Sequence, residues 1–183
     1  MKTKIILVDG ADNAGKTSLI RDICEISDRY VKIEFPKRTS EGRFDIKSRN
    51  EVACFETMLK YLDPSKIYLL DRGYISNWVY GMIRQEKESI LDMYEEDFHR
   101  LCKHNNVLPI ILTRNEMTED FEDDLISLSA EGFNKVISLF EEFADTNDVH
   151  IYQLLNHYGN NKIKSFNANE RNALITMIIK WAR

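Results

Sequence analysis

The sequence element that most restricts the fold is the segment Gly10–Thr17, Gly-Ala-Asp-Asn-Ala-Gly-Lys-Thr. It lies between an apolar run, Ile5–Asp9, and a stretch with helical spacing, Lys16–Ile26. A glycine-rich loop in that setting offers main-chain N–H groups and the positive end of a helix dipole to an anion. The segment therefore predicts a phosphate-binding loop rather than a chance glycine turn, because strand, spacing, Lys-Thr pair and helix all agree.

Each residue type in this loop has a physical reason to be there. Gly10 lets the backbone leave the strand and turn, and Gly15 lets N–H groups approach phosphate oxygens closely. We expect Lys16 to reach the β- and γ-phosphates of ATP and Thr17 to offer a hydroxyl to Mg²⁺. The residues expected to bind ATP are Gly10, Asn13, Ala14, Gly15, Lys16, Thr17 and Ser18.

The rest of the chain alternates apolar runs with helical patterns. The runs are almost continuously apolar, which is typical of strands buried on both faces of a parallel sheet. This order predicts a three-layer α/β fold of the P-loop NTPase type, with a five-stranded parallel sheet flanked by helices. The predicted strands are Ile5–Asp9, Val31–Phe35, Ile67–Asp71, Val107–Leu112 and Val149–Leu154, and the predicted helices are Lys16–Ile26, Arg49–Leu62, Ser89–His104, Phe133–Ala144 and Asn172–Trp181.

Length and charge limit the classes of protein that remain. The chain has 183 residues, of which 43% are hydrophobic, and a formal net charge of -5. This predicts one domain, residues 1–183, with a substantial core. The negative charge argues against coating nucleic acid, which requires a basic field. No apolar stretch approaches the length of a membrane span. We therefore expect neither a membrane nor, because of the negative charge, nucleic acid as a partner.

The three cysteines, Cys24, Cys54 and Cys102, are scattered along the chain. Their number is odd and none forms a C-x-x-C pair, so the sequence predicts neither a disulfide framework nor a zinc site. Reduced thiols are typical of a cytoplasmic protein. Met1 to Lys4 leave no room for a signal peptide before the first strand, so we expect a cytoplasmic location.

A polar pair, Asp71 and Arg72, ends the third predicted strand. A carboxylate at a strand end beside a phosphate loop helps to hold Mg²⁺, and a guanidinium suits phosphate because it donates two parallel hydrogen bonds. The alternative is a surface ion pair that caps the strand. With a phosphate loop in the same chain, we favour a metal role for Asp71, together with Thr17, and a phosphate role for Arg72.

Four stretches, taken in order, resemble the thymidylate kinase family of nucleoside monophosphate kinases. They are Val8–Thr17, Phe35-Pro36-Lys37-Arg38-Thr39, Phe55 on a predicted helix, and Asp71-Arg72-Gly73-Tyr74-Ile75-Ser76-Asn77-Trp78-Val79-Tyr80. The resemblance covers residues 1 to about 82 and is weak beyond them. The phosphate loop is common to many families, so the second and fourth stretches are the more diagnostic ones.

The resemblance implies a role for each matching position. Arg38 and Arg72 would hold the acceptor monophosphate, and Tyr80 would lie under the sugar, where its ring leaves no space for a 2′-hydroxyl. Phe55 would stack on the base, and Asn77 would touch the base edge. The residues implied in substrate binding are Asp12, Phe35, Arg38, Phe55, Arg72, Ser76, Asn77 and Tyr80, and those implied in catalysis are Lys16, Asp12, Arg72, Arg114 and Arg84.

Several of these positions also have a simpler interpretation. Phe55 would suit the core, because its helix neighbours are apolar too, and Tyr80 would suit ordinary packing. Asn77 would suit a helix-start cap, and Arg38 would suit a solvated loop charge. The sequence leaves these alternatives open.

The chain departs from the family pattern in its charge and in its base contacts. Asn13 stands where the family has an arginine, and the segment 114–128, expected to form a lid, is acidic over Asn115–Asp124. Arg114 and Arg84 are the candidates to replace the missing cation. Leu59 stands where the family has a base-reading arginine, and Gly73 where an aromatic is common, with Tyr74 next to it.

Three functions fit these residues. The first is ATP- and Mg²⁺-dependent phosphorylation of a deoxynucleoside monophosphate, expected to be dTMP, in nucleotide biosynthesis. The second is a deoxynucleoside kinase, for which Glu34 would be the carboxylate base. The third is a nucleotide-binding protein without catalysis. The expected partners are small nucleotides. The resemblance also implies a second copy of the chain. The candidate interface helices are Ser76–Arg84, with Trp78 as the anchor, and Arg49–Leu62.

Overall fold

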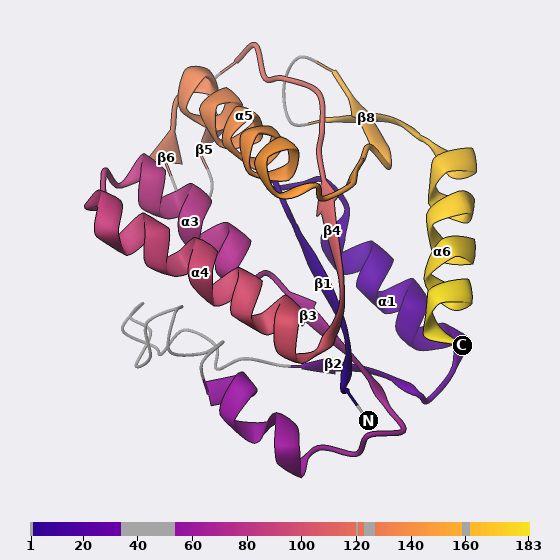
Figure 1. Ribbon diagram of the computed structural model, residues 1–183. Helices are drawn as coiled ribbons and strands as arrows, with labels where there is room; N and C mark the ends of the chain where they lie inside the picture. The colour runs from indigo at the N-terminus through magenta and orange to yellow at the C-terminus, as the bar shows by residue number, and fades with distance from the viewer. Residues whose placement is uncertain (1, 34–53, 120, 123–126, 159–161) are drawn as a thin grey trace, which may run out of the picture. The chain divides into compact units, whose positions relative to one another are not determined.

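The computed structural model describes residues 2–33, 54–119, 121–122, 127–158 and 162–183. Its main sheet is the predicted five-stranded parallel sheet, flanked by helices, and it has the strand order β2-β3-β1-β4-β7 (Figure 1). The register aligns Val8 of β1 with Asp71 of β3. The strands are β1 (Lys4–Gly10), β2 (Tyr30–Ile33), β3 (Ile67–Asp71), β4 (Asn106–Leu112) and β7 (Ile151–Tyr152).

All but one of the predicted helices have their bounds described, and each of these agrees with the prediction to within a turn or two. The described helices are α1 (Lys16–Ile26), α3 (Tyr74–Ile83), α4 (Glu88–His104), α5 (Ala130–Asn147) and α6 (Ala168–Ala182). Of the predicted helix Arg49–Leu62, residues 54–58 are helical and a 3-10 turn follows at Leu59–Tyr61, while 49–53 lie outside the described residues.

The chain divides into two compact units. Unit 1 comprises Met1–Val8 and Ile20–Leu108, and unit 2 comprises Asp9–Leu19 and Pro109–Arg183. The chain passes from one unit to the other within β1, within α1 and within β4. The single-domain organisation of residues 1–183 stays a prediction.

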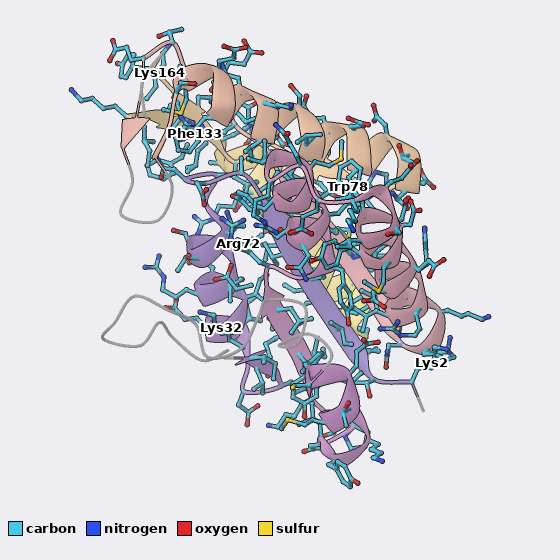
Figure 2. The ribbon with its side chains drawn as sticks, turned by 90° about the vertical axis from the view of Figure 1, so that its left-hand side faces the viewer. Lys2, Lys32, Arg72, Trp78, Phe133 and Lys164 are labelled. Atoms are coloured by element: carbon cyan, nitrogen blue, oxygen red, sulfur yellow. The ribbon has the colours of Figure 1, made fainter. Side chains whose placement is uncertain are left out.

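In unit 1, helices α3 and α4 lie side by side (Figure 1). Their close approach depends on Gly81, because a Cβ there would lie 2.8 Å from Leu91 Cδ2. The first part of β1 and the whole of β3 are buried apart from their ends, as expected for central parallel strands. Trp78 projects from α3 and is half-buried (Figure 2).

In unit 2 the strand that forms is shorter than the predicted one. The expected strand Val149–Leu154 pairs with β4 only at Ile151 and Tyr152. The pairing ends there because the N–H of Gln153 donates to the Glu170 carboxylate, at 2.9 Å, instead of to β4. Two short hairpins were not predicted: β5 (Phe121–Glu122) with β6 (Ser127–Leu128), and β8 (Leu155–His157) with β9 (Ile163–Phe166).

The three cysteines are free thiols. Cys54 is exposed, whereas burial raises the pKa of Cys24 and raises that of Cys102 to about 11. Among the described residues, no helix has the length and apolar character that crossing a membrane requires.

Candidate functional site

The phosphate loop of unit 2 leaves β1 in a conformation that only glycine tolerates. Gly10 has a φ of +130°, and a Cβ at this position would lie 2.1 Å from the main-chain oxygen of Leu112. The close approach continues at Ala11, whose N–H donates to the same oxygen at 3.2 Å. Gly15, with a φ of +97°, is the last of the three loop residues with a positive φ before α1, after Gly10 and Asn13. The turn predicted at Gly10 is therefore present, whereas the approach of N–H groups to phosphate at Gly15 stays a prediction.

Lys16 is buried and folds back over its own loop. Its Nζ donates to the carbonyl of Gly10 at 3.0 Å and to that of Ala11 at 2.6 Å. Thr17 and Ser18 are exposed on the first turn of α1, and Ala14 is buried beneath the loop. The phosphate contact predicted for Lys16 would require it to exchange these two carbonyl partners for phosphate oxygens.

Asn13 has a φ of +56°, which places it in the left-handed region. Asparagine is among the few residues that adopt this conformation readily, whereas a long side chain there is unusual. The backbone therefore gives a physical reason for finding asparagine, and not arginine, at this loop position.

Arg114 follows β4 and lies against the phosphate loop. The residue is 5% exposed, and its Nη1 donates to the main-chain oxygen of Asp12 at 3.3 Å. Burial lowers the pKa of the Arg114 guanidinium, and the Asp12 charge partly opposes that shift. An arginine remains protonated at neutral pH even so. Unit 2 thus brings one of the two candidate replacement cations directly to the loop.

The predicted lid segment 114–128 is described only in part. The Asn134 side chain of α5 holds Met117 by two hydrogen bonds, of 2.7 and 2.8 Å, to the N–H and the carbonyl of Met117. Asp120 and residues 123–126 lie outside the described residues. A lid function for this segment stays a prediction.

His157 on β8 is a contact of the loop that the sequence did not indicate. Its Nε2 lies 3.1 Å from the main-chain oxygen of Asn13, and its side chain is buried. Burial lowers the pKa of His157, and so does the nearby charge of Arg114, whereas the hydrogen bond to Asn13 opposes the shift. No local pattern marks this residue, because its partner is 144 positions away.

Unit 1 brings together three of the residues predicted to bind the acceptor. Arg72 Nη1 donates to Ser76 Oγ at 3.1 Å, and the Arg72 guanidinium lies 5.5 Å from the centre of the Tyr80 ring. Arg72 has a φ of +73°, an uncommon value for a residue other than glycine. Non-glycine residues in this region cost roughly 1–2 kcal/mol and cluster at functional sites.

Asn77 is the fourth of these residues and is 7% exposed. Its Nδ2 is buried and has no hydrogen-bond partner among the described residues. Its backbone N–H donates to the carbonyl of Gly73, the residue at the N-cap position of α3. Asn77 therefore lies inside the helix and not at the helix-start position that the alternative prediction assigns to it.

Asp71 is half-buried at the end of β3, where Lys32 of β2 approaches it. The Lys32 Nζ lies 3.8 Å from Asp71 Oδ2. Lys32 was missed by the sequence analysis because the pairing depends on the β2–β3 register. In the part of the chain that the structure describes, no group of three or more acidic, histidine or cysteine side chains forms a metal site.

Phe55 is 4% exposed, and its ring centre lies 6.4 Å from that of Tyr68 in an edge-to-face arrangement. This burial agrees with the alternative interpretation, core packing, and stacking on a base would require its face to be uncovered. Next to it, Glu56 accepts hydrogen bonds from Tyr74 at 2.5 Å and from Arg100 at 2.6 Å. Tyr74, the aromatic beside Gly73, thus belongs to a partly buried polar network with Glu56 and Arg100.

Arg84 is exposed at the end of α3 and pairs with Glu86 at 2.9 Å. Its catalytic role stays a prediction. Glu34, Phe35 and Arg38 lie outside the described residues, so their predicted roles have no structural account.

A parallel sheet whose central strand leads through a glycine-rich loop into a helix defines a P-loop α/β fold. Comparison with solved structures agrees. A thymidylate kinase from Ehrlichia chaffeensis is 19% identical, with 100% of both chains covered and a TM-score of 0.53. A thymidylate kinase from Candida albicans is 16% identical, with 100% of this chain and 94% of the other covered and a TM-score of 0.59.

A deoxyadenosine kinase from M. mycoides with bound dATP is also similar, at 12% identity and a TM-score of 0.58, with 96% of this chain and 99% of the other covered. No family model matches the sequence. A search of curated proteins finds no match either. The resemblance stated from the sequence is therefore confirmed as a shared fold with thymidylate kinases and related P-loop nucleotide kinases.

Proposed function

We propose that this protein transfers the γ-phosphoryl group of ATP to a deoxynucleoside monophosphate, with dTMP as the expected acceptor and other deoxynucleoside monophosphates as alternatives. The observation that carries the proposal is the cluster Arg72–Ser76–Tyr80 in a chain that also has a complete phosphate loop. An arginine anchored by a hydroxyl and an aromatic ring is suited to a phosphate attached to a sugar.

The phosphate loop would bind the donor. Its N–H groups and the N-terminus of α1 favour the triphosphate, and Lys16 would move from the Gly10 and Ala11 carbonyls to the phosphate oxygens. Phosphoryl transfer needs mainly positioning and neutralisation of charge. Arg114, a buried cation that contacts the Asp12 carbonyl, is the better placed of the two candidates to supply part of that charge beside the loop.

The oxygen donors of Thr17 and Asp71 suit Mg²⁺, which prefers hydroxyl, carboxylate and phosphate ligands. Thr17 is exposed at the start of α1, and Asp71 is only loosely paired with Lys32 at 3.8 Å. Mg²⁺ would neutralise charge on the phosphates. Thr17 and Asp71 would orient it.

The acceptor is expected to contact Arg72 through its phosphate and Tyr80 through its sugar. Asn77 supports this assignment. Its buried Nδ2 has no hydrogen-bond partner among the described residues, which destabilises the protein. A hydrogen bond from this amide to a bound acceptor would remove that penalty. Asp12 would face the deoxyribose, as the resemblance implies.

A coupled assay of ADP release with Mg²⁺ and each of the four deoxynucleoside monophosphates tests the proposal. We expect turnover with at least one of them and its loss in Lys16→Ala. No turnover with any acceptor, from a protein that binds ATP, would instead support a nucleotide-binding protein without catalysis.

A deoxynucleoside kinase is the second candidate, because a solved structure of similar fold is a deoxyadenosine kinase. The two candidates differ in the acceptor, which is a nucleoside in one case and a nucleoside monophosphate in the other. Faster turnover of thymidine or deoxyadenosine than of the matching monophosphate would favour the second candidate.

We also propose that the protein is a homodimer through α3, where half-buried Trp78 is the expected anchor. Measurement of the mass in solution at low micromolar concentration tests this proposal. A monomeric mass would exclude it.

A further inference from the structure

The main-chain oxygens of four consecutive residues in the phosphate loop all accept hydrogen bonds from side chains of unit 2. Lys16 donates to Gly10 and Ala11, at 3.0 and 2.6 Å. Arg114 donates to Asp12 at 3.3 Å, and the His157 ring contacts Asn13 at 3.1 Å. Each carbonyl of the loop from residue 10 to residue 13 therefore has a side-chain partner.

The direction of these carbonyls determines the direction of the N–H groups. In a planar trans peptide the N–H points opposite to the carbonyl that precedes it, and the described chain has no cis peptide. Holding the Asn13 carbonyl therefore orients the N–H of Ala14, and holding the Asp12 carbonyl orients that of Asn13. A concave set of main-chain N–H groups is what binds phosphate in such a loop.

The contact of His157 differs from that of Lys16 in one respect. Lys16 is expected to leave its carbonyls for the phosphates of ATP, whereas no phosphate contact is proposed for the His157 ring, which contacts only the Asn13 carbonyl of the loop. A carbonyl oxygen only accepts, so the Nε2 of His157 carries the proton in this contact. The Asn13 contact can therefore persist when nucleotide is bound.

The backbone of His157 is fixed by a hydrogen bond to the side chain of Asn115. Asn115 Oδ1 accepts the backbone N–H of His157 at 2.9 Å and the side-chain amide of Gln153 at 3.0 Å. Leu155, on the same strand β8, packs on the loop, because a Cβ on Gly15 would lie 3.4 Å from its Cδ1. These contacts fix β8 against the loop at Asn13 and at Gly15.

We propose that His157 is a positioning residue of the phosphate loop: its Nε2–H holds the Asn13 carbonyl so that the N–H of Ala14 faces the donor phosphates. This inference rests on the proposed function, since it assumes that the loop binds ATP. It assigns a role in the donor site to the β8–β9 hairpin, which carries no recognisable nucleotide-binding motif. The affinity for ATP, and not for the acceptor, should therefore depend on the residue at position 157.

The test is calorimetric titration of the full chain with MgATP. His157→Leu removes the donor, and we expect its dissociation constant for MgATP to rise about three- to tenfold, the usual value of one hydrogen bond. His157→Gln offers an amide N–H near the position of Nε2 and should restore binding to within about twofold of the parent, whereas the shorter His157→Asn should not. The KM for the acceptor should not change in any of them. His150→Leu, at an exposed histidine of the same unit, is the matched control.

Each outcome decides a different question. Parental affinity in His157→Leu, or weak binding in His157→Gln and His157→Asn alike, overturns the positioning role. If His157→Leu does not fold, the comparison of His157→Gln with His157→Asn gives the same decision. Lys16→Ala is included throughout. If it binds MgATP as tightly as the parent, the proposed function itself fails, which is a different result from an effect at His157 alone.

Discussion

The guanidinium of Arg72 lies 5.5 Å from the centre of the Tyr80 ring, two helical turns along α3, and Ser76 bonds to the same guanidinium from the turn between them. The residue proposed to bind the acceptor phosphate is thus supported by the residue proposed to face the sugar. A change at either position should affect both parts of acceptor recognition.

Replacing Arg72 by lysine should weaken acceptor binding while leaving ATP binding unchanged. Lysine keeps the charge but loses the planar fork, the bond to Ser76 and the contact with Tyr80. We expect the KM for the acceptor to rise about ten- to a hundredfold, on the order of 1.5–3 kcal/mol for a charge-assisted hydrogen bond. Steady-state kinetics with saturating ATP measure this change. Arg21→Lys, at a side chain that is 67% exposed, is the control, and an unchanged KM in Arg72→Lys would remove Arg72 from the acceptor site.

Tyr80→Ala should reduce the preference for deoxyribose. If the ring excludes a 2′-hydroxyl, its removal should raise kcat/KM for a ribonucleoside monophosphate relative to the deoxy form by about tenfold, a typical value for steric discrimination. Tyr80→Phe keeps the ring and should keep the preference. A ratio that is the same in the parent and in Tyr80→Ala would favour ordinary packing as the role of Tyr80.

Gly10→Ala should destabilise the protein far more than Gly15→Ala. Both glycines have a positive φ, but only the Cβ at Gly10 meets main-chain atoms, at 2.1 Å from the Leu112 oxygen, whereas that at Gly15 meets a flexible leucine at 3.4 Å. We expect about 3 kcal/mol or more for Gly10→Ala and about 1–2 kcal/mol for Gly15→Ala. Urea unfolding provides the measurement. Equal losses would mean that the loop moves away from β4 at little cost.

The stability of the protein should fall on mild acidification partly because of His157. Its pKa is lowered from the usual 6.5 in the folded protein, so between the lowered pKa and 6.5 the unfolded chain binds more protons. This contribution is complete above about pH 6.5 and is lost as the pH falls towards the lowered value. The urea midpoint of the parent should therefore decrease more between about pH 7.5 and pH 5.5 than that of His157→Gln. Parallel decreases would show that His157 titrates normally.

Tyr74→Phe should lower the free energy of unfolding by about 1–3 kcal/mol, because the buried Tyr74 loses its hydrogen bond to the Glu56 carboxylate. Burial and the bond to Glu56 both raise the pKa of Tyr74, so the tyrosine stays protonated and can donate this bond near neutral pH. Tyr61→Phe, at a residue that is 77% exposed, is the matched control. Chemical denaturation of the two variants side by side decides whether the network stabilises unit 1.

Local patterns were sufficient for the central part of the fold. The bounds of α1 and β3 match the predictions, because glycine and charged residues end these segments and their apolar spacing is regular. The phosphate loop was predictable for the same reason, since all its residues lie within eight consecutive positions.

Features that depend on distant partners were not predictable. The strand after α5 ends early because Glu170 takes its next N–H, and the β8–β9 hairpin has exposed side chains along all of β9, so no alternation marks it. Lys32 and His157 have ordinary sequence surroundings. Their partners, Asp71 and Asn13, are brought to them only by the sheet register and by the hairpin.

The unequal exposure of the three thiols gives the protein a built-in attachment point for a spectroscopic label. A maleimide reacts with the thiolate form of cysteine. Burial raises the pKa of Cys24, and it raises the pKa of Cys102 to about 11, so both thiols stay protonated near neutral pH. Cys54 is exposed and directly precedes Phe55. A maleimide dye should therefore label Cys54 without any mutation, and its emission would report whether an added nucleotide changes the surroundings of Phe55.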